Sequence, residues 1–310
     1  MPRIAFLGPL GTFTEEALLS QADLAPPASD LVPVASIPEV LAVTERGEVD
    51  LGFVAIENAI EGTVNASIDA LAFEHDLLIQ REVVIPVHQN LLAPPGCGLA
   101  DIKAVMSIPV ATAQVRRWLS ANLPGVEEIA ANSTAEAARL VGDGAHPHTA
   151  AIAPAVAAEL YGLEVVASAI EDHPENETRF VAVAPSGIPA STGHDKTTIV
   201  CFQSADRPGS LLAILQEFAA RAINLTKIES RPTKQGLGDY CFAIDFEGHV
   251  ADELVADCLR DVRAKIADVK FLGSYPAAGE HGEVRRRDAE VAWRQADEWV
   301  QGLRADVADR

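Results

Sequence analysis

Segments typical of β-strands alternate with segments typical of helices through the first 184 residues of this chain. Strands are predicted at 3–7, 31–35, 51–56, 102–106, 150–153, 165–170 and 180–184, and helices at 14–21, 38–46, 64–73, 110–121, 135–141 and 155–161. This alternation favours α/β layers around a mostly parallel sheet. A β-rich stretch at 77–92 interrupts it and predicts two lobes with a cleft between them. Ligands of open α/β sheets lie beyond the carboxyl ends of the strands, so the cleft is the expected site.

A second pattern follows a segment rich in proline, glycine and serine, PSGIPASTGHD at 185–195, which is typical of a linker. Strands are predicted at 197–202, 225–229, 239–246 and 269–273, and helices at 210–221 and 252–267. The order βαββαβ in about eighty residues is that of a ferredoxin-like fold. The expected domains are therefore 1–184, the linker 185–195, 196–275, and a helical tail at 276–310.

The tail has apolar residues at alternating spacings of four and three. They are Ala289, Trp293, Ala296, Val300, Leu303 and Val307. The spacing predicts a helix with one apolar seam. A helix packed on its own subunit is the favoured interpretation, because fewer than three heptads make a weak coiled coil; a self-association seam is the alternative.

Composition excludes several classes of partner. The formal net charge of the 310 residues is −21, whereas nucleic acids and anionic membranes require a basic surface. The cysteines, at positions 97, 201, 241 and 258, form no CxxC pair and are expected to be reduced thiols. With no signal-peptide pattern and no apolar stretch long enough to span a bilayer, a cytoplasmic location is expected.

Three strand-to-helix junctions combine glycine or proline with hydroxyl side chains, and the first two also carry acidic ones. They are GPLGTFTEEA at 8–17, ENAIEGTVNAS at 57–67 and SIPVATAQ at 107–114. Helix N-termini direct free N–H groups toward ligands and bind carboxylates, so an acidic chain can still hold an anionic substrate. The first junction is not the G-x-G-x-x-G fingerprint and no P-loop lysine follows, so nucleotide binding is rejected. His146 and His148 have no partner at metal-ligand spacing, and no metal is expected.

Two longer motifs point to one family. In the first, Tyr161-x-Leu163-x-x-Val166 precedes Asp172 and, after five more residues, Thr178-Arg179-Phe180-Val181-x-Val183. The second is LTKIESRP at 225–232. Together with GPLGTFTE and ENAIEGTV, they resemble the prephenate dehydratase family, in which the second motif belongs to a regulatory ACT domain. The resemblance covers residues 1 to about 275. The family often has Ser-His-Pro where this chain has Ser107-Ile108-Pro109, which leaves the general acid open.

The resemblance implies a cytosolic lyase of phenylalanine biosynthesis with a two-lobed, periplasmic-binding-protein-like catalytic domain. It converts prephenate, a dicarboxylate, to phenylpyruvate, carbon dioxide and water; aromatisation drives the reaction, so no cofactor is expected. The candidate catalytic residues are Thr178, Arg179, Phe180, Glu57, Asn58, Glu61, Thr12 and Ser107. Thr178 would donate a hydrogen bond to the leaving hydroxyl. Arg179 is either a forked clamp for a carboxylate or a salt-bridge partner of Glu175 or Glu177, and a protonated Glu57 or Glu61 is a candidate supporting acid.

The resemblance also implies feedback inhibition by L-phenylalanine, enclosed by motifs from paired ACT domains. The candidate effector-binding residues are Pro208, Gly209, Ser210, Leu211, Asn224, Leu225, Glu229, Ser230 and Arg231. Pairing of these domains implies a homodimer or homotetramer. Two alternatives remain open from the sequence: an arogenate dehydratase, and a non-catalytic protein that senses amino acids.

Overall fold

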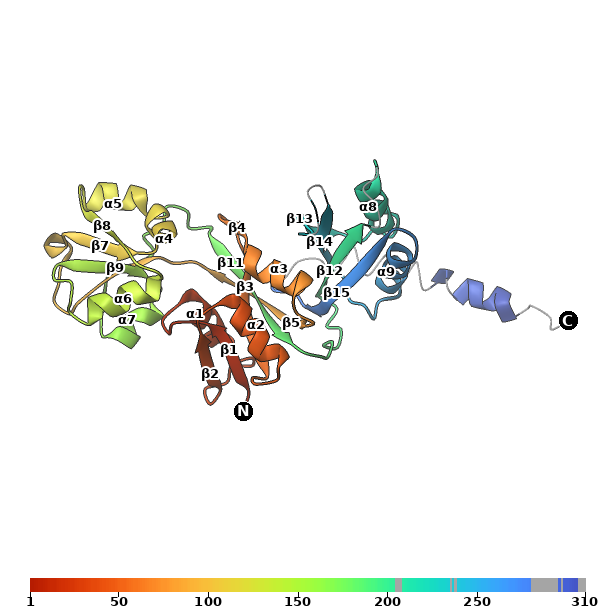
Figure 1. Cartoon of the computed structure of the whole chain (residues 1–310), viewed down its shortest axis with the longest axis horizontal. Coiled ribbons are helices and arrows are strands. Elements are labelled where there is room, and N and C mark those ends of the chain that lie inside the picture. The colour runs from red at the N-terminus through yellow and green to blue at the C-terminus, as the bar shows by residue number, and fades with distance from the viewer. Residues whose placement is uncertain (204–207, 235, 237–238, 280–294, 297, 306–310) are drawn as a thin grey trace. The chain divides into compact units, whose positions relative to one another are not determined.

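A computed structural model describes residues 1–203, 208–234, 236, 239–279, 295–296 and 298–305 (Figure 1). The chain divides into two compact units. The first unit consists of Met1–Asp76 and Val83–Pro185, and the second of Leu77–Glu82 and Ser186–Arg310.

The first lobe of the first unit is built on a six-stranded sheet of order β2-β1-β3-β11-β5, with β4 paired to β3. Its strands are β1 (Arg3–Leu7), β2 (Asp30–Val34), β3 (Leu51–Asn58), β4 (Gly62–Thr63), β5 (Leu78–Pro86) and β11 (Glu177–Ala184). The first part of β5, to Glu82, is assigned to the second unit. The helices of this lobe are α1 (Phe13–Leu19), α2 (Ile37–Glu45) and α3 (Asn65–Phe73). Hydroxyl caps start two of the helices, since Thr12 and Ser36 accept the backbone N–H of the third residue of α1 and of α2.

The second lobe is built on a five-stranded sheet of order β10-β6-β9-β7-β8. Its strands are β6 (Asn90–Ala93), β7 (Ala104–Ser107), β8 (Glu127–Ala130), β9 (Thr149–Ala153) and β10 (Glu164–Ala167). Its helices are α4 (Pro109–Ala113), α5 (Arg116–Asn122), α6 (Thr134–Gly142) and α7 (Val156–Tyr161), with a 3₁₀ turn at Leu99–Asp101. Leu91 and Leu92 belong to different core clusters, because successive strand residues point to opposite faces. Helices therefore cover this sheet on both faces.

Both lobes differ from the predicted mostly parallel sheet. The strand β11 runs antiparallel to β3, and β6 runs antiparallel to both β9 and β10. Parallel neighbours require a crossover helix within one lobe, whereas the chain enters β6 and β11 along segments that pass between lobes. The single helix predicted at 110–121 is two helices, because Val115 leaves helical geometry with φ −119° and ψ 14°. The strand β8 was not predicted; its burial pattern is mostly exposed, so it lacks an apolar signal.

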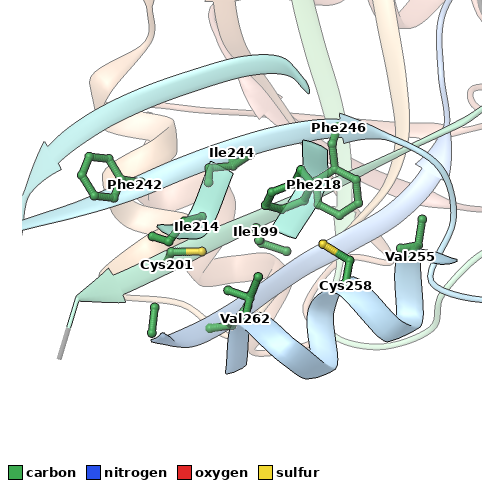
Figure 2. Close-up of a cluster of buried hydrophobic side chains, with 12 residues drawn as sticks. Ile199, Cys201, Ile214, Phe218, Phe242, Ile244, Phe246, Val255, Cys258 and Val262 are labelled. Carbon is green, nitrogen blue, oxygen red and sulfur yellow. The ribbon is translucent and has the colours of Figure 1, made fainter. Parts of the chain in front are cut away.

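The second unit contains an antiparallel sheet of order β13-β14-β12-β15. Its elements are β12 (Asp195–Gln203), α8 (Ser210–Ala220), β13 (Leu225–Pro232), β14 (Tyr240–Glu247), α9 (Glu253–Lys265) and β15 (Ala267–Pro276). Figure 2 shows side chains of α8 and α9 packed against β12 and β14, including Phe218 on Phe246 at 5.0 Å between ring centroids. The predicted ferredoxin-like βαββαβ order is confirmed.

The cysteines are free thiols. Cys201, Cys241 and Cys258 are buried in the core of the second unit. Burial raises the pKa of Cys201 and of Cys258 to about 12, so both remain protonated at neutral pH. These thiols act as small apolar core groups.

The tail is described only in part. Residues 298–305 are helical, while Ala289, Trp293 and Val307 of the predicted seam lie outside the described residues. Of the seam residues that the structure describes, Ala296 and Leu303 are exposed and Val300 is partly buried. Within the described part of the chain, no helix combines the length and apolar character needed to cross a bilayer.

Candidate active site

Pairing of β11 with β3 places Thr178 opposite Asn58. Asn58 Nδ2 lies 2.9 Å from Thr178 Oγ1 and 2.9 Å from Asn176 Oδ1. Asn58 Oδ1 accepts the backbone N–H groups of Ile60 and Glu61, at 3.0 and 2.9 Å. These two acceptor contacts fix which end of the amide is nitrogen, so Asn58 donates to Thr178. The bond uses an oxygen lone pair of Thr178, and its hydroxyl hydrogen can be donated to a ligand.

Arg179 forms an ion pair with Glu57, its cross-strand neighbour, at 3.3 Å between Nη1 and Oε2. The arginine is 8% exposed. The expected alternative partner Glu175 instead lies 3.4 Å from His173 Nδ1. The Glu57 side chain is 35% exposed, and Glu61 is exposed.

Gln114, which caps the C-terminus of α4 in the second lobe, forms hydrogen bonds with polar side chains near Thr178. Its Oε1 lies 3.3 Å from Asn176 Nδ2 and 3.4 Å from Gln89 Nε2, and its Nε2 lies 3.2 Å from Glu61 Oε1. Residues of the first lobe and a glutamine of the second therefore form one connected set of polar side chains. Asn176 and Gln114 were not among the predicted site residues, although both lie inside the motifs 172–183 and 107–114. Gln114 is the last residue of its motif, and Asn176 lies between two of the acids that precede Thr178.

Asp172 has a structural role at the same junction. Its carboxylate accepts the backbone N–H groups of Arg117 and Trp118, at 2.9 and 3.2 Å, and so caps α5. Its own N–H donates to the carbonyl of Gln114 at 2.7 Å. The acidic residue of the motif thus fixes the main chain that carries Gln114.

Three predicted site residues are engaged elsewhere. Thr12 Oγ1 caps α1 through Glu15 N at 3.3 Å. Ser107 is fully buried and donates to the carbonyl of Ile152 at 2.7 Å, inside the second lobe. Phe180 is 1% exposed and stacks on Phe53 with ring centroids 5.3 Å apart, in the core of the first lobe.

The glycine loop of the first lobe meets α7 of the second. Tyr161 Oη donates to the carbonyl of Leu10 at 2.7 Å, and burial raises the pKa of Tyr161. Gly11 has φ +87°, and a Cβ there would lie 3.0 Å from the Tyr161 ring. Glycine is therefore needed at this position both for its conformation and for the close approach of the ring.

The second unit has a pocket of about 470 Å³ beside the N-terminus of α8. It is lined by Gln203, Gly209, Ser210, Leu211, Leu212, Leu215, Ser230, Tyr240 and Phe242. Gly209, Ser210, Leu211 and Ser230 were predicted as effector-binding residues. Of the other predicted residues, Pro208 is exposed, Leu225 packs on the core of the unit, Asn224 Nδ2 donates to Glu247 Oε1 at 3.0 Å, and Arg231 pairs with Glu229 at 3.3 Å.

Among the described residues, no cluster of three or more histidine, cysteine, aspartate or glutamate side chains is arranged to hold a metal ion.

Two α/β lobes joined through a set of polar side chains around a threonine hydroxyl, together with a ferredoxin-like unit that has its own small pocket, are the arrangement expected of a two-lobed enzyme with an attached effector-type domain. Residues 4–187 match the family model for prephenate dehydratase, and residues 197–264 match that for the ACT domain. The chain belongs to the prephenate dehydratase family, as its motifs predicted, and is a lyase.

The similarity extends over nearly the whole chain. A prephenate dehydratase of Mycolicibacterium gilvum (strain PYR-GCK) is 44% identical over 313 residues, which cover 98% of this chain and 99% of the relative. The structure of a prephenate dehydratase from Arthrobacter aurescens, in complex with L-Phe, has a TM-score of 0.85 and 40% identity and covers 97% of this chain and 99% of the other. The structure of GqqA, described as a novel type of quorum quenching acylase, has a TM-score of 0.79 and 30% identity, and the match covers 89% of this chain and 98% of the other. The predicted fold class and family are confirmed.

Proposed function

We propose that the chain converts prephenate to phenylpyruvate, with the Thr178 hydroxyl as the hydrogen-bond donor to the departing hydroxyl group. The observation that carries this proposal is the 2.9 Å contact from Asn58 Nδ2 to Thr178 Oγ1. Because Thr178 accepts from an amide whose orientation is fixed, its own hydrogen points to another acceptor. Donors aligned in a chain also strengthen one another.

The reaction balances without a redox partner. The bond between the ring and its carboxylate breaks, carbon dioxide leaves, and the electron pair enters the ring. The para C–O bond breaks as the ring becomes aromatic, and the hydroxide that leaves takes a proton from solvent to become water. The ordinary pKa of a threonine hydroxyl is far too high for full proton transfer, so Thr178 stabilises the developing charge. A positioned donor of this kind is worth about 2–4 kcal/mol in the transition state.

Arg179 is proposed to hold a substrate carboxylate. Its contact with Glu57 is 3.3 Å, whereas strong charge-assisted hydrogen bonds measure about 2.7–2.9 Å. A dicarboxylate that presents two oxygens to the guanidinium fork can therefore compete with Glu57. Thr12 and Ser107 contribute in this proposal by fixing the ends of α1 and β7, at the margin of the site.

L-Phenylalanine is proposed to bind in the pocket of the second unit and to inhibit the enzyme. The first N–H groups of α8 and the Ser210 hydroxyl suit its carboxylate, and Ser230 suits its ammonium. Leu215 and Phe242 provide apolar lining for the ring. The complex of the Arthrobacter aurescens relative with L-Phe supports this choice of effector.

A homodimer or homotetramer is proposed because the rim of this pocket is apolar and open. Leu212 is 57% exposed and Tyr240 is 46% exposed, and both line the pocket. A second ACT domain would cover them and supply the effector residues that lie elsewhere in one copy, among them Asn224 and Glu229. Light scattering at micromolar concentration tests this, and a monomer would contradict it. A cytoplasmic location is part of the same proposal, since free thiols persist in a reducing compartment.

The enzymatic proposal is tested by following phenylpyruvate in the ultraviolet during incubation with prephenate, and with arogenate in parallel. Turnover of prephenate with a higher kcat/KM than arogenate supports it. Preference for arogenate would make the chain an arogenate dehydratase. Binding of phenylalanine without turnover of either compound would support a non-catalytic sensor.

A further inference from the structure

We infer that Asn176 is a positioning residue that orients Thr178 through Asn58 and couples this orientation to Gln114 of the second lobe. The inference rests on the proposed role of Thr178 as hydrogen-bond donor. It concerns a residue that would not touch the substrate, and its evidence is the direction of four consecutive side-chain hydrogen bonds.

The direction of these bonds begins at Asn58. Its Oδ1 is occupied by two backbone N–H groups, so its Nδ2 must face Asn176 and Thr178. Asn176 Oδ1 is the acceptor at 2.9 Å, which leaves Asn176 Nδ2 to face Gln114 Oε1 at 3.3 Å. Gln114 Nε2 then faces the Glu61 carboxylate at 3.2 Å. Every amide in this relay is used as acceptor at one end and donor at the other.

Hydrogen bonds on both sides fix the main chain at Asn176. Asn176 is 1% exposed, its N–H donates to the carbonyl of His173 at 3.1 Å, and its carbonyl accepts Val87 N at 2.8 Å. The residue ends the segment that enters β11, two positions before Thr178. Its backbone bonds do not involve the side chain, so the side-chain amide is free to serve the relay.

Only an amide of this length satisfies both neighbours. A carboxylate would still accept from Asn58 but would place an oxygen against Gln114 Oε1. An apolar side chain would leave Asn58 Nδ2 with two remaining acceptors, Thr178 Oγ1 and the carbonyl of Glu177 at 3.2 Å. With Asn176 accepting one hydrogen of Asn58, the other is directed at Thr178. Without Asn176 the Asn58 amide can turn toward the Glu177 carbonyl, and its bond to Thr178 is no longer held in one direction.

Gln114 makes this arrangement depend on the second lobe. It lies at the C-terminus of α4, and its Oε1 also accepts from Gln89 at 3.4 Å. The contacts of Gln114 with Asn176 and Glu61, at 3.3 and 3.2 Å, are the links of this relay that join the two lobes. The Thr178 hydroxyl is then fully oriented only when Gln114 is in place.

A double-mutant cycle on the full chain tests the inference. Asn176→Ala should lower kcat by about tenfold with KM within about twofold, the effect of one lost orienting hydrogen bond. In the background of Thr178→Val, which lacks the oriented hydroxyl, the same change should cost less than about twofold. An equal loss in both backgrounds, or no loss in the native background, overturns the inference.

Asn90→Ala is the matched control, since Asn90 is also buried, at 5% exposure, and its amide bonds to backbone carbonyls of the second lobe. Any kinetic loss from Asn90→Ala should be the same in both backgrounds. If Thr178→Val turns over prephenate as fast as the native chain, the donor role and the positioning role both fail. If Thr178→Val is impaired and the cycle is additive, the donor role stands and the positioning role alone fails.

Asn176→Asp keeps the size of the side chain and tests the direction of the relay. Its carboxylate faces Gln114 Oε1 at neutral pH, whereas the protonated form restores a donor there. Burial raises the pKa of such a group above its ordinary value of about 3.9. The deficit in kcat relative to the native chain should therefore shrink as pH falls. A deficit that is the same at every pH overturns the inference.

Discussion

Replacement of Thr178 by valine removes the hydroxyl and keeps the branched shape of the side chain. Asn58 Nδ2 retains Asn176 Oδ1 at 2.9 Å and the Glu177 carbonyl at 3.2 Å as acceptors. Since no buried donor is left unpaired, the free energy of unfolding should change by less than about 1 kcal/mol. The kinetic effect can then be assigned to the missing donor.

The expected kinetic effect follows from the worth of one positioned donor. A loss of about 2–4 kcal/mol of transition-state stabilisation lowers kcat by roughly 30-fold to 10³-fold. KM should change little, because the bond strengthens only as the C–O bond breaks. Initial rates of phenylpyruvate formation measure both constants, and Thr178→Ser should keep much of the activity. If the serine and valine variants are equally active or equally impaired, the hydroxyl is not the catalytic feature.

Four further predictions concern other parts of the chain. Arg179→Lys should raise KM about tenfold with little change in kcat, because a point charge replaces a fork; an unchanged KM would assign Arg179 to its ion pair with Glu57. Leu212→Glu should raise the inhibitory concentration of phenylalanine about tenfold or more without altering the basal rate, whereas Leu303→Glu, at a site of similar exposure, should not. Burial acts to raise the pKa of Asp195, but hydrogen bonds from Ser191, Thr192 and Gly193 outweigh it and lower the pKa. The stability gained from this carboxylate is present at neutral pH and lost as pH falls through the lowered pKa. The free energy of unfolding of Asp195→Asn in urea should therefore be lower than that of the native chain at pH 7, and the difference should shrink in acid. Deletion of 280–310 should leave the turnover rate intact, and an inactive truncation would mean that the tail completes the fold.

Two of the candidate catalytic residues, Thr178 and Asn58, could be selected from the sequence because their signal was local. Thr178 and Asn58 stand at strand ends, and pairing of β11 with β3 brings them opposite each other. Phe180 follows Thr178 in the same motif but lies in the core, because β11 continues into the sheet after a register shift at Arg179 and Phe180. Proximity along a motif therefore did not predict proximity at the site.

The sequence did not predict the contacts between the two lobes. Gln114 lies 62 positions from Asn176, and nothing in the spacing of the two amides predicts a hydrogen bond. The break at Val115, which separates α4 from α5, was hidden by a continuous helical pattern across 110–121. In the second unit, Tyr240 and Phe242 were missed because they join the pocket across the pairing of β13 with β14, where Ser230 lies opposite Phe242.

The central claim is tested most directly by the products that the full chain makes from prephenate at neutral pH. Phenylpyruvate and carbon dioxide should appear together in equal amounts, without any added cofactor. L-Phenylalanine should slow both, and a sample without enzyme sets the background. Formation of neither product above this background would contradict the account.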